Sequence, residues 1–450
     1  MTSRGGTIDG FFYKNANNGA TGGDGSVDPA PRLGGTRVND LHHDGPKLCA
    51  YVSPDPSEED LQWLTQMGVT HCFTWIRYLE GWNTRSIASL RRIIEAHGLI
   101  LNNIGCLELG KNPAIILGTR DRDAEIERFA TFIGMLSKAG VHVTTFTWEP
   151  EGVVYSTGTA VVRGGALGRY VDAHTLSRLP TSSPAGETIT EARLWANMAY
   201  FLERMVPVCE RHRVRLLLHP NDPPMQQVCG MPCLMRTREA FERVFAAAGN
   251  SPWVGMEFCC GTWMEGLRKG SSRDDDDAGC GDRVRGGDGE TRGDGSDSKS
   301  VSRCGGGDAS RHGDPVGVDD GAQGWASHGR SGDRDDGGGG CDAAVRVLGG
   351  FGHGPDALFE ALDHFIRLGK VGIVHLRNTT APLPRFAETF VDDGFLDVCR
   401  VARVLVNAKF HGTVILDHTP PFAGQAGDRC ATSFSIGYIK ACLRAAQAAL

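Results

Sequence analysis

The sequence predicts an α/β protein built as a (β/α)8 TIM barrel. Eight short apolar runs alternate along the chain with longer amphipathic segments. The runs lack a regular polar-apolar alternation, as is typical of parallel strands that are buried on both faces. Eight β-then-α units favour a closed barrel over an open, doubly wound sheet. The predicted strands are residues 47–52, 70–75, 99–105, 141–148, 214–219, 253–259, 371–376 and 412–418.

A helical pattern follows each predicted strand. Ser57 and the acidic residues after it resemble an N-cap, and Gly68 resembles a C-cap, so the first helix has both of its ends marked. No Gly-x-Gly-x-x-Gly motif follows the first strand, so dinucleotide binding is not indicated. The predicted helices are residues 57–68, 86–98, 122–140, 191–212, 236–248, 357–368, 395–407 and 433–449.

Two segments do not fit the barrel pattern. Residues 1–45 are rich in Gly, Asn and Asp, and residues 271–345, after the sixth strand, are rich in Gly and Asp with almost no Leu, Ile or Phe. Such segments bury too little apolar surface to offset the entropy cost of ordering. We therefore expect a disordered leader, a single barrel domain over residues 46–450, and a disordered insertion within it.

Composition narrows the class of protein. The formal net charge is −7 and no basic stripe is present, so nucleic-acid binding is not expected. No apolar run reaches the roughly 18 residues of a membrane span, and the first residues lack a signal-peptide core, so we expect a cytoplasmic protein. The 14 cysteines form no Cys-x-x-Cys pair, and most, Cys442 among them, are expected to be reduced and buried. Homo-oligomer formation is compatible with the sequence.

Metal-binding residue types recur at the ends of four predicted strands. His219 follows Leu-Leu-Leu, Cys259 ends Met-Glu-Phe-Cys, His375 follows Gly-Ile-Val, and Asp417 follows Val-Ile-Leu. The carboxyl ends of barrel strands open onto one face, so the four side chains should converge there. A single His or Cys is ordinary in a core, whereas Asp417 is a carboxylate at a buried strand end and needs a partner. The recurrence of such residues on the last four strands predicts a metal site. The mixed N, S and O donors suit Mn, Fe, Co or Zn better than Mg or Ca.

Further polar residues accompany this site. Arg377 lies two residues after His375 and should point the same way; it either binds a substrate carboxylate or forms a salt bridge at the barrel rim. His418 is placed to act as a general acid or base, or to hydrogen-bond a ligand. Loop residues that are either functional or solvated are Asp222, Asn378, Glu388, Asp392 and Asp393.

The motifs around these residues resemble, in order, those of the mannonate dehydratase family, a xylose-isomerase-like barrel family. They are RGGA (163–166), HPNDPP (219–224), FCCGTW (258–263), VHLRN (374–378), FAETFVDDGFLD (386–397), LDH (416–418) and SIGY (435–438). The resemblance covers roughly residues 47–267 and 350–450, and excludes the leader and the insertion.

The resemblance implies a hydro-lyase that converts D-mannonate into 2-keto-3-deoxy-D-gluconate and water, in the breakdown of glucuronate and other hexuronates. It also implies a single Mn(II) or Fe(II) ion and a small sugar acid as the partner. The family's metal ligands fall on His219, Cys259, His375 and Asp417, and its catalytic histidine falls on His418.

The sequence departs from the family pattern at two places. Asn221 stands where the family has an aspartate, which predicts a change in a substrate hydroxyl contact. The family's catalytic tyrosine lies just before the Ile-Gly of the last helix, where this chain has Ser433 and Phe434. Tyr438, about one helical turn later, is the candidate to replace it. Two alternatives therefore stay open: another metal-dependent sugar isomerase or epimerase of the superfamily, or a catalytically impaired barrel.

Overall fold

A computed structural model describes residues 45–150, 155–179, 189–267, 350–352, 354 and 356–450. The predicted insertion lies outside the described residues, and so does the predicted leader apart from Gly45. The disorder expected of both segments stays a prediction.

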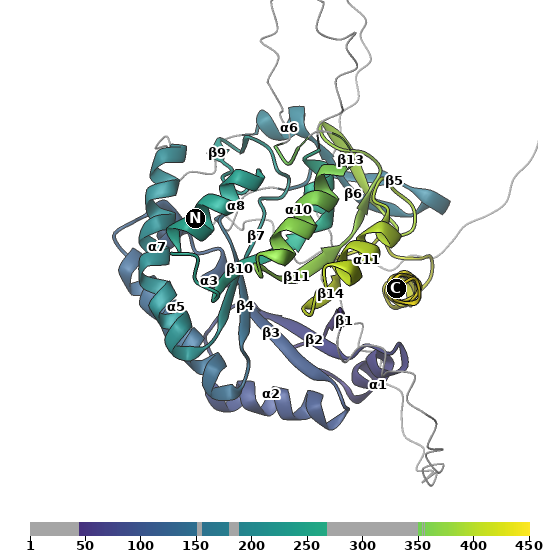
Figure 1. The fold of residues 1–450 in the computed structure, drawn as a ribbon, viewed down its shortest axis with the longest axis horizontal. Helices are drawn as coiled ribbons and strands as arrows, with labels where there is room; N and C mark the ends of the chain where they lie inside the picture. The colour runs from purple at the N-terminus through teal and green to yellow at the C-terminus, as the bar shows by residue number, and fades with distance from the viewer. Residues whose placement is uncertain (1–44, 151–154, 180–188, 268–349, 353, 355) are drawn as a thin grey trace, which may run out of the picture. The chain divides into compact units, whose positions relative to one another are not determined.

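A parallel eight-stranded sheet forms the centre of the fold (Figure 1). Its order is β3-β2-β1-β14-β11-β10-β7-β4, and the Thr144 hydroxyl of β4 donates a hydrogen bond of 2.8 Å to the Ile104 carbonyl of β3, so the two ends of this order adjoin. Each strand matches a predicted one to within two residues at either end, which confirms the barrel. The strands are β1 (Lys47–Tyr51), β2 (His71–Ile76), β3 (Ile100–Cys106), β4 (Val143–Thr147), β7 (Arg215–His219), β10 (Val254–Cys259), β11 (Val371–Leu376) and β14 (Thr413–Leu416).

Helices follow the strands as predicted. Ser57 caps the first of them, because its hydroxyl accepts a hydrogen bond of 3.1 Å from the Asp60 amide. The last helix begins six residues earlier than predicted, because its polar first turn carries no apolar repeat. The helices are α1 (Glu58–Gln66), α2 (Thr84–Ala96), α3 (Leu107–Gly110), α4 (Pro113–Leu117), α5 (Arg122–Ala139), α6 (Ala173–Ser177), α7 (Glu191–His212), α8 (Arg238–Ala247), α9 (Cys260–Glu265), α10 (Asp356–Arg367), α11 (Val398–Asn407) and α12 (Gly427–Ala448), with a 3-10 turn at Arg163–Gly165.

Two apolar layers hold the barrel. The larger one lies between the strands and the surrounding helices. A smaller layer fills the barrel interior, with Cys49, Phe73, Leu217, Ile373 and Ile415 each contributed by a different strand. Among the helices within the described ranges, none is both long and apolar enough to cross a bilayer.

A second sheet was not predicted from the sequence. It is antiparallel, in the order β12-β13-β6-β5, and Figure 1 shows β5, β6 and β13 side by side. These strands are short and partly polar, so no apolar run marks them. They are β5 (Gly158–Val161), β6 (Leu167–Asp172), β12 (Asn378–Thr379) and β13 (Arg385–Thr389); a separate hairpin is formed by β8 (Gln227–Val228) and β9 (Met231–Pro232).

The cysteine prediction was wrong for one pair. Cys442 of α12 forms a disulfide with Cys399 of α11 and is not reduced. The two helices pack against each other and bring the two Cα atoms to 4.8 Å, which is within the range that a disulfide spans. Nine other cysteines in the described part of the chain are free, and eight of these are buried, as expected.

The close pairing of β6 with β13 depends on Gly168. A Cβ atom at this position would overlap the backbone carbonyl of Glu388 on the neighbouring strand. We expect Gly168→Ala to lower the free energy of unfolding by about 1–3 kcal/mol, the usual cost of overpacking, as measured by urea denaturation. Gly437→Ala is the control, because a Cβ there meets no atom within 4 Å and the residue lies in helix α12. Equal urea midpoints for the two variants would contradict this prediction.

Candidate metal centre

The inner apolar layer of the barrel gives way to polar residues at the strand ends. Side chains two residues apart on a strand point to the same side. Three of the predicted ligands, His219, His375 and Asp417, each lie two positions beyond a residue of this layer, namely Leu217, Ile373 and Ile415. Cys259 ends β10, which stands between β7 and β11 in the sheet. The structure thus brings the four predicted ligands to one end of the barrel.

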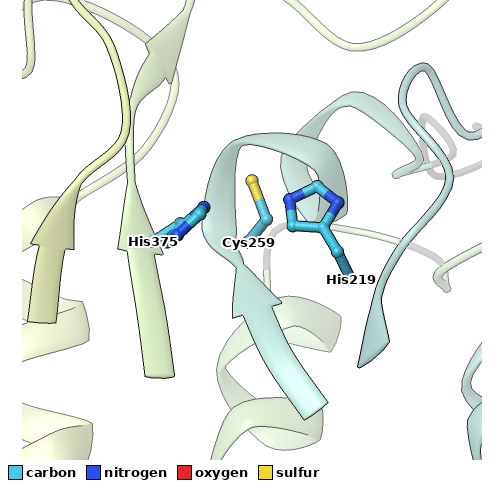
Figure 2. Close-up of side chains that lie close together, drawn as sticks. All are labelled: His219, Cys259 and His375. Carbon is cyan, nitrogen blue, oxygen red and sulfur yellow. The ribbon is translucent and has the colours of Figure 1, made fainter. Parts of the chain in front are cut away.

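Three of these side chains form a compact group of metal donors. One ligand atom each from His219, Cys259 and His375 lies within 4.8 Å of the others. Figure 2 shows Cys259 between the two imidazoles, at the ends of neighbouring strands. Asp417 adjoins the group, with Oδ2 3.6 Å from the Cys259 sulfur and Oδ1 3.8 Å from Nδ1 of His375. We call these four residues the donor cluster.

The charge state of Cys259 suits a metal ligand. Burial by itself would raise the pKa of this thiol, but the Arg377 guanidinium and hydrogen bonds from His219 and His375 outweigh burial and lower the pKa to about 6. The Thr262 hydroxyl also donates a hydrogen bond of 3.2 Å to the sulfur. A thiolate, the form of cysteine that binds metals, is therefore favoured at neutral pH.

His375 is oriented by a carboxylate that sequence reasoning missed. Glu257 lies deeper on β10, and its Oε1 is 2.7 Å from Nε2 of His375. Burial lowers the pKa of His375, but Glu257 and Asp417 outweigh it and raise the pKa well above its usual value. The other ring nitrogen, Nδ1, is buried and lies 3.8 Å from Oδ1 of Asp417, beside the Cys259 sulfur. A carboxylate beside one imidazole nitrogen, with the second nitrogen directed at the other donors, is the usual arrangement of a metal-binding histidine, so these residues fit a divalent ion.

Two buried arginines stand beside the donor cluster and share three carboxylates. Arg377 contacts Glu388 at 2.5 Å, Asp222 at 2.7 Å and Glu265 at 3.0 Å. Arg169, on β6, contacts the same three carboxylates at 2.7, 3.0 and 3.4 Å. We call these five residues the arginine–carboxylate cluster. Buried charges persist only when they are paired in this way.

The pairing leaves Arg377 enclosed. Its side chain is fully buried, and its Nε also lies 3.3 Å from Asp417. Of the two roles that the sequence allows for Arg377, the contacts in the structure match the salt bridge, because its partners are the protein's own carboxylates. Burial would raise the pKa of Asp222, but Arg169 and Arg377 outweigh it and hold that pKa well below its usual range. The guanidinium therefore orders the carboxylates around the donor cluster.

His418 lies at the solvent side of the donor cluster. Its Nδ1 is 2.7 Å from Glu388 Oε2, its Nε2 is 3.6 Å from Asp417 Oδ1, and 31% of its side chain is exposed. Burial lowers the pKa of His418, but Asp417 and Glu388 outweigh it and raise the pKa above its usual value. The raised pKa favours the imidazolium form, which Glu388 holds in place, so this histidine is suited to donate a proton.

Other candidates from the sequence make structural contacts. Asn221, expected to alter a substrate hydroxyl contact, accepts a hydrogen bond of 2.7 Å from the Met235 amide and donates one of 3.3 Å to the Trp148 carbonyl. An aspartate could not make the second bond. Asn378 donates its amide hydrogens to two backbone carbonyls. The loop aspartates Asp392 and Asp393 form ion pairs with Arg163.

At the place of the family's tyrosine, Ser433 also makes a structural contact. Ser433 accepts a hydrogen bond of 3.0 Å from the Trp63 indole on α1. Tyr438 is half-buried and packs against the main apolar core. Within the described ranges, no hydrogen bond or ring contact joins Tyr438 to the donor cluster.

Fold and site together define a (β/α)8 barrel with a cluster of potential metal ligands at the carboxyl ends of its strands. Residues 164–268 match the family described as D-mannonate dehydratase (UxuA). The mannonate dehydratase of Thermotoga petrophila is 30% identical over 213 residues, which cover 41% of this chain and 58% of that protein. The mannonate dehydratase of Shouchella clausii is 28% identical over 212 residues, which again cover 41% of this chain and 58% of that protein. The match thus spans less than two thirds of the curated relatives.

The fold likeness extends further along the chain. The crystal structure of mannonate dehydratase from Streptococcus suis serotype 2 superposes with a TM-score of 0.62 at 17% identity, and covers 90% of this chain and 95% of that one. These matches confirm the resemblance predicted from the motifs. The chain is similar to the mannonate dehydratase family in sequence over residues 164–268, and to a mannonate dehydratase in fold over most of its length.

Proposed function

We propose that this protein is a hydro-lyase that dehydrates D-mannonate, or a closely related aldonic acid, to 2-keto-3-deoxy-D-gluconate. One observation supports the proposal most strongly: a cysteine, two imidazoles and a carboxylate converge next to a partly exposed histidine, His418. The similarity to mannonate dehydratases supports the choice of substrate. A cytoplasmic role in hexuronate breakdown belongs to the same proposal.

In this proposal His219, Cys259, His375 and Asp417 hold one divalent ion, Mn(II) or Fe(II). Such an ion acts as a Lewis acid on the oxygens of a 2-hydroxy acid and makes its C2 proton removable. Glu257 fixes the ring of His375 so that one nitrogen faces the site. Arg377 favours the thiolate of Cys259 and neutralises charge around the ligands.

His418 supplies the acid of the reaction. Its imidazolium hands a proton to the departing C3 hydroxyl, which leaves as water. Glu388, 2.7 Å from the opposite ring nitrogen, keeps the ring oriented during this transfer. The chemistry also needs a group that accepts the C2 proton.

The test is an assay of chelator-treated and metal-reconstituted protein against a panel of aldonic acids and aldoses. We expect a 2-keto-3-deoxy acid from D-mannonate with Mn(II), or with Fe(II) under anaerobic conditions, and none after chelation. Adding the metal back should restore turnover. A reconstituted protein that leaves every aldonic acid unchanged but isomerises an aldose would overturn the proposal in favour of the isomerase alternative.

A further inference from the structure

The proposed reaction lacks a base in the site described so far. The proposal assigns His418 to the acid, held by Glu388 at 2.7 Å, and assigns the donor cluster to holding the ion. Ser433, at the family's tyrosine position, hydrogen-bonds Trp63. A carboxylate elsewhere at the barrel mouth fits the missing role.

Glu149 lies just past the end of β4 and faces the interior of the mouth. The strand register pairs Thr147 with His219 of β7, and Glu149 comes two residues later, on the same side as Thr147. The residue between them, Trp148, points outward and packs on Phe201 of helix α7, with ring centroids 5.8 Å apart. Glu149 therefore projects inward, on the side of the mouth next to His219.

One oxygen of Glu149 is left without a partner. The side chain is 5% exposed, and its Oε1 is buried with no hydrogen-bond partner among the described residues. The other oxygen, Oε2, lies 3.9 Å from the Lys111 ammonium, which in turn is 2.5 Å from the Tyr155 hydroxyl. Leaving a buried acceptor unsatisfied is costly, so Oε1 is suited to a ligand that brings its own hydrogen.

The charges around Glu149 tune it for proton transfer. Burial raises its pKa, Lys111 lowers it, Asp222 raises it, and His219 and Arg169 lower it, with a net result of about 7. A general base works best when its pKa is near the working pH. The carboxyl is thus ready both to accept a proton and to release it.

We propose that Glu149 is the general base of this site, and that Lys111, itself held by Tyr155, is a positioning residue beside its second oxygen. The inference rests on the proposed dehydration. In the barrel order, β4 and β14 stand opposite each other, with β7, β10 and β11 between them on one side. Glu149 follows β4 and His418 follows β14. Base and acid therefore flank the donor cluster and reach a bound sugar acid from opposite sides.

The step balances without a further reactant. Oε1 of Glu149 takes the proton from C2, and the electron pair of the C2–H bond forms the C2–C3 double bond. The C3–O bond breaks, and the hydroxyl leaves as water with the proton from His418. The resulting enol gains a proton on C3 from Glu149 and loses the proton of its C2 oxygen, which returns to His418.

The experiment compares the full-length, metal-loaded wild type with Glu149→Gln and Glu149→Asp on D-mannonate. The glutamine variant should lose about 10²–10⁴-fold in kcat, the usual contribution of a general base, while its metal content and KM change by less than about threefold. Deuterium at C2 of the substrate should slow the glutamine variant more than the wild type, because proton removal becomes rate-limiting. The aspartate variant should recover part of kcat.

Variants at two other positions, Glu108 and Lys111, distinguish a catalytic role of Glu149 from a structural one. Glu108→Gln changes a carboxylate outside the site, paired with Arg128 at 2.8 Å, and should keep wild-type kcat. Lys111→Met should lower kcat by less than the roughly 10²-fold minimum expected for loss of the base itself, and Lys111→Arg should restore much of it.

The outcomes also separate the inference from the proposed function. No product from any aldonic acid with the wild type would overturn both. An active wild type with a glutamine variant within about threefold of its kcat would overturn the base assignment alone, since a base is worth far more. Activity lost in step with metal content, or an unchanged isotope effect, would also overturn the assignment.

Discussion

Replacing Cys259 with serine should strip the protein of its divalent ion and abolish dehydration. Serine keeps the size of the side chain but remains a neutral hydroxyl, whereas the pKa of about 6 makes Cys259 a thiolate. Because losing a residue that merely orients a ligand costs about 10–100-fold in metal affinity, we expect loss of the ligand itself to cost more than about 100-fold. Metal content by mass spectrometry and the 2-keto-3-deoxy acid assay measure both effects.

The neighbouring cysteine provides a matched control. Cys260 is equally buried, but its side chain belongs to the main apolar core, and burial raises the pKa of its thiol well above the usual value. Cys260→Ser should keep the metal and lose only about 1 kcal/mol of stability, a common cost for one core substitution. A Cys259→Ser protein that retains one ion per chain would show that the sulfur is not a ligand.

Replacing Arg377 with methionine should be among the most destabilising changes in the chain. It would leave Asp222, Glu265 and Glu388 with only Arg169 for compensation in a buried site. Breaking a buried ion pair by removing one partner costs about 3–5 kcal/mol, and we expect a loss of that size in the free energy of unfolding by urea. The metal content of the folded fraction should also fall, since Arg377 favours the thiolate of Cys259.

Arg163, an exposed arginine, provides a control that distinguishes the effect of burying the ion pair from the effect of removing a positive charge. Arg163 pairs with Asp392 at 2.8 Å, and 42% of its side chain is exposed. Arg163→Met removes the same charge and adds the same side chain, but should change stability by less than about 1 kcal/mol, as exposed ion pairs do. Similar urea midpoints for the Arg163 and Arg377 variants would mean that the arginine–carboxylate cluster does not stabilise the fold.

The barrel could be predicted because each of its strands is an apolar run. A strand buried on both faces is mostly apolar, and this pattern marked all eight strands, although β4 also buries Thr144 and Thr145. The donor cluster could be located because metal-binding residue types recur at the ends of the last four strands. Barrel geometry then made four residues far apart in the sequence converge.

The surroundings of the donor cluster were less accessible to sequence reasoning. Arg169 and Glu388 lie on strands of the antiparallel sheet, and those strands carry too few apolar residues to be recognised. Glu149 looks like an ordinary loop residue. Glu257 and Glu265 did carry a signal: each is a carboxylate inside an otherwise apolar segment, where a buried charge needs a partner. The need of a buried carboxylate for a partner identified Asp417 as a site residue. The same argument would also have identified Glu257 and Glu265.

The closure of the barrel sets the order in which the protein can assemble. Its first and last strands pair directly, Lys47 with Thr413, so the ring closes only after strand β14 has been synthesised. Pairings this distant in sequence form slowly. The donors come from β7, β10, β11 and β14, and the last of these strands is the one that closes the ring. A divalent ion that bound all four donors would therefore stabilise the closed barrel by mass action.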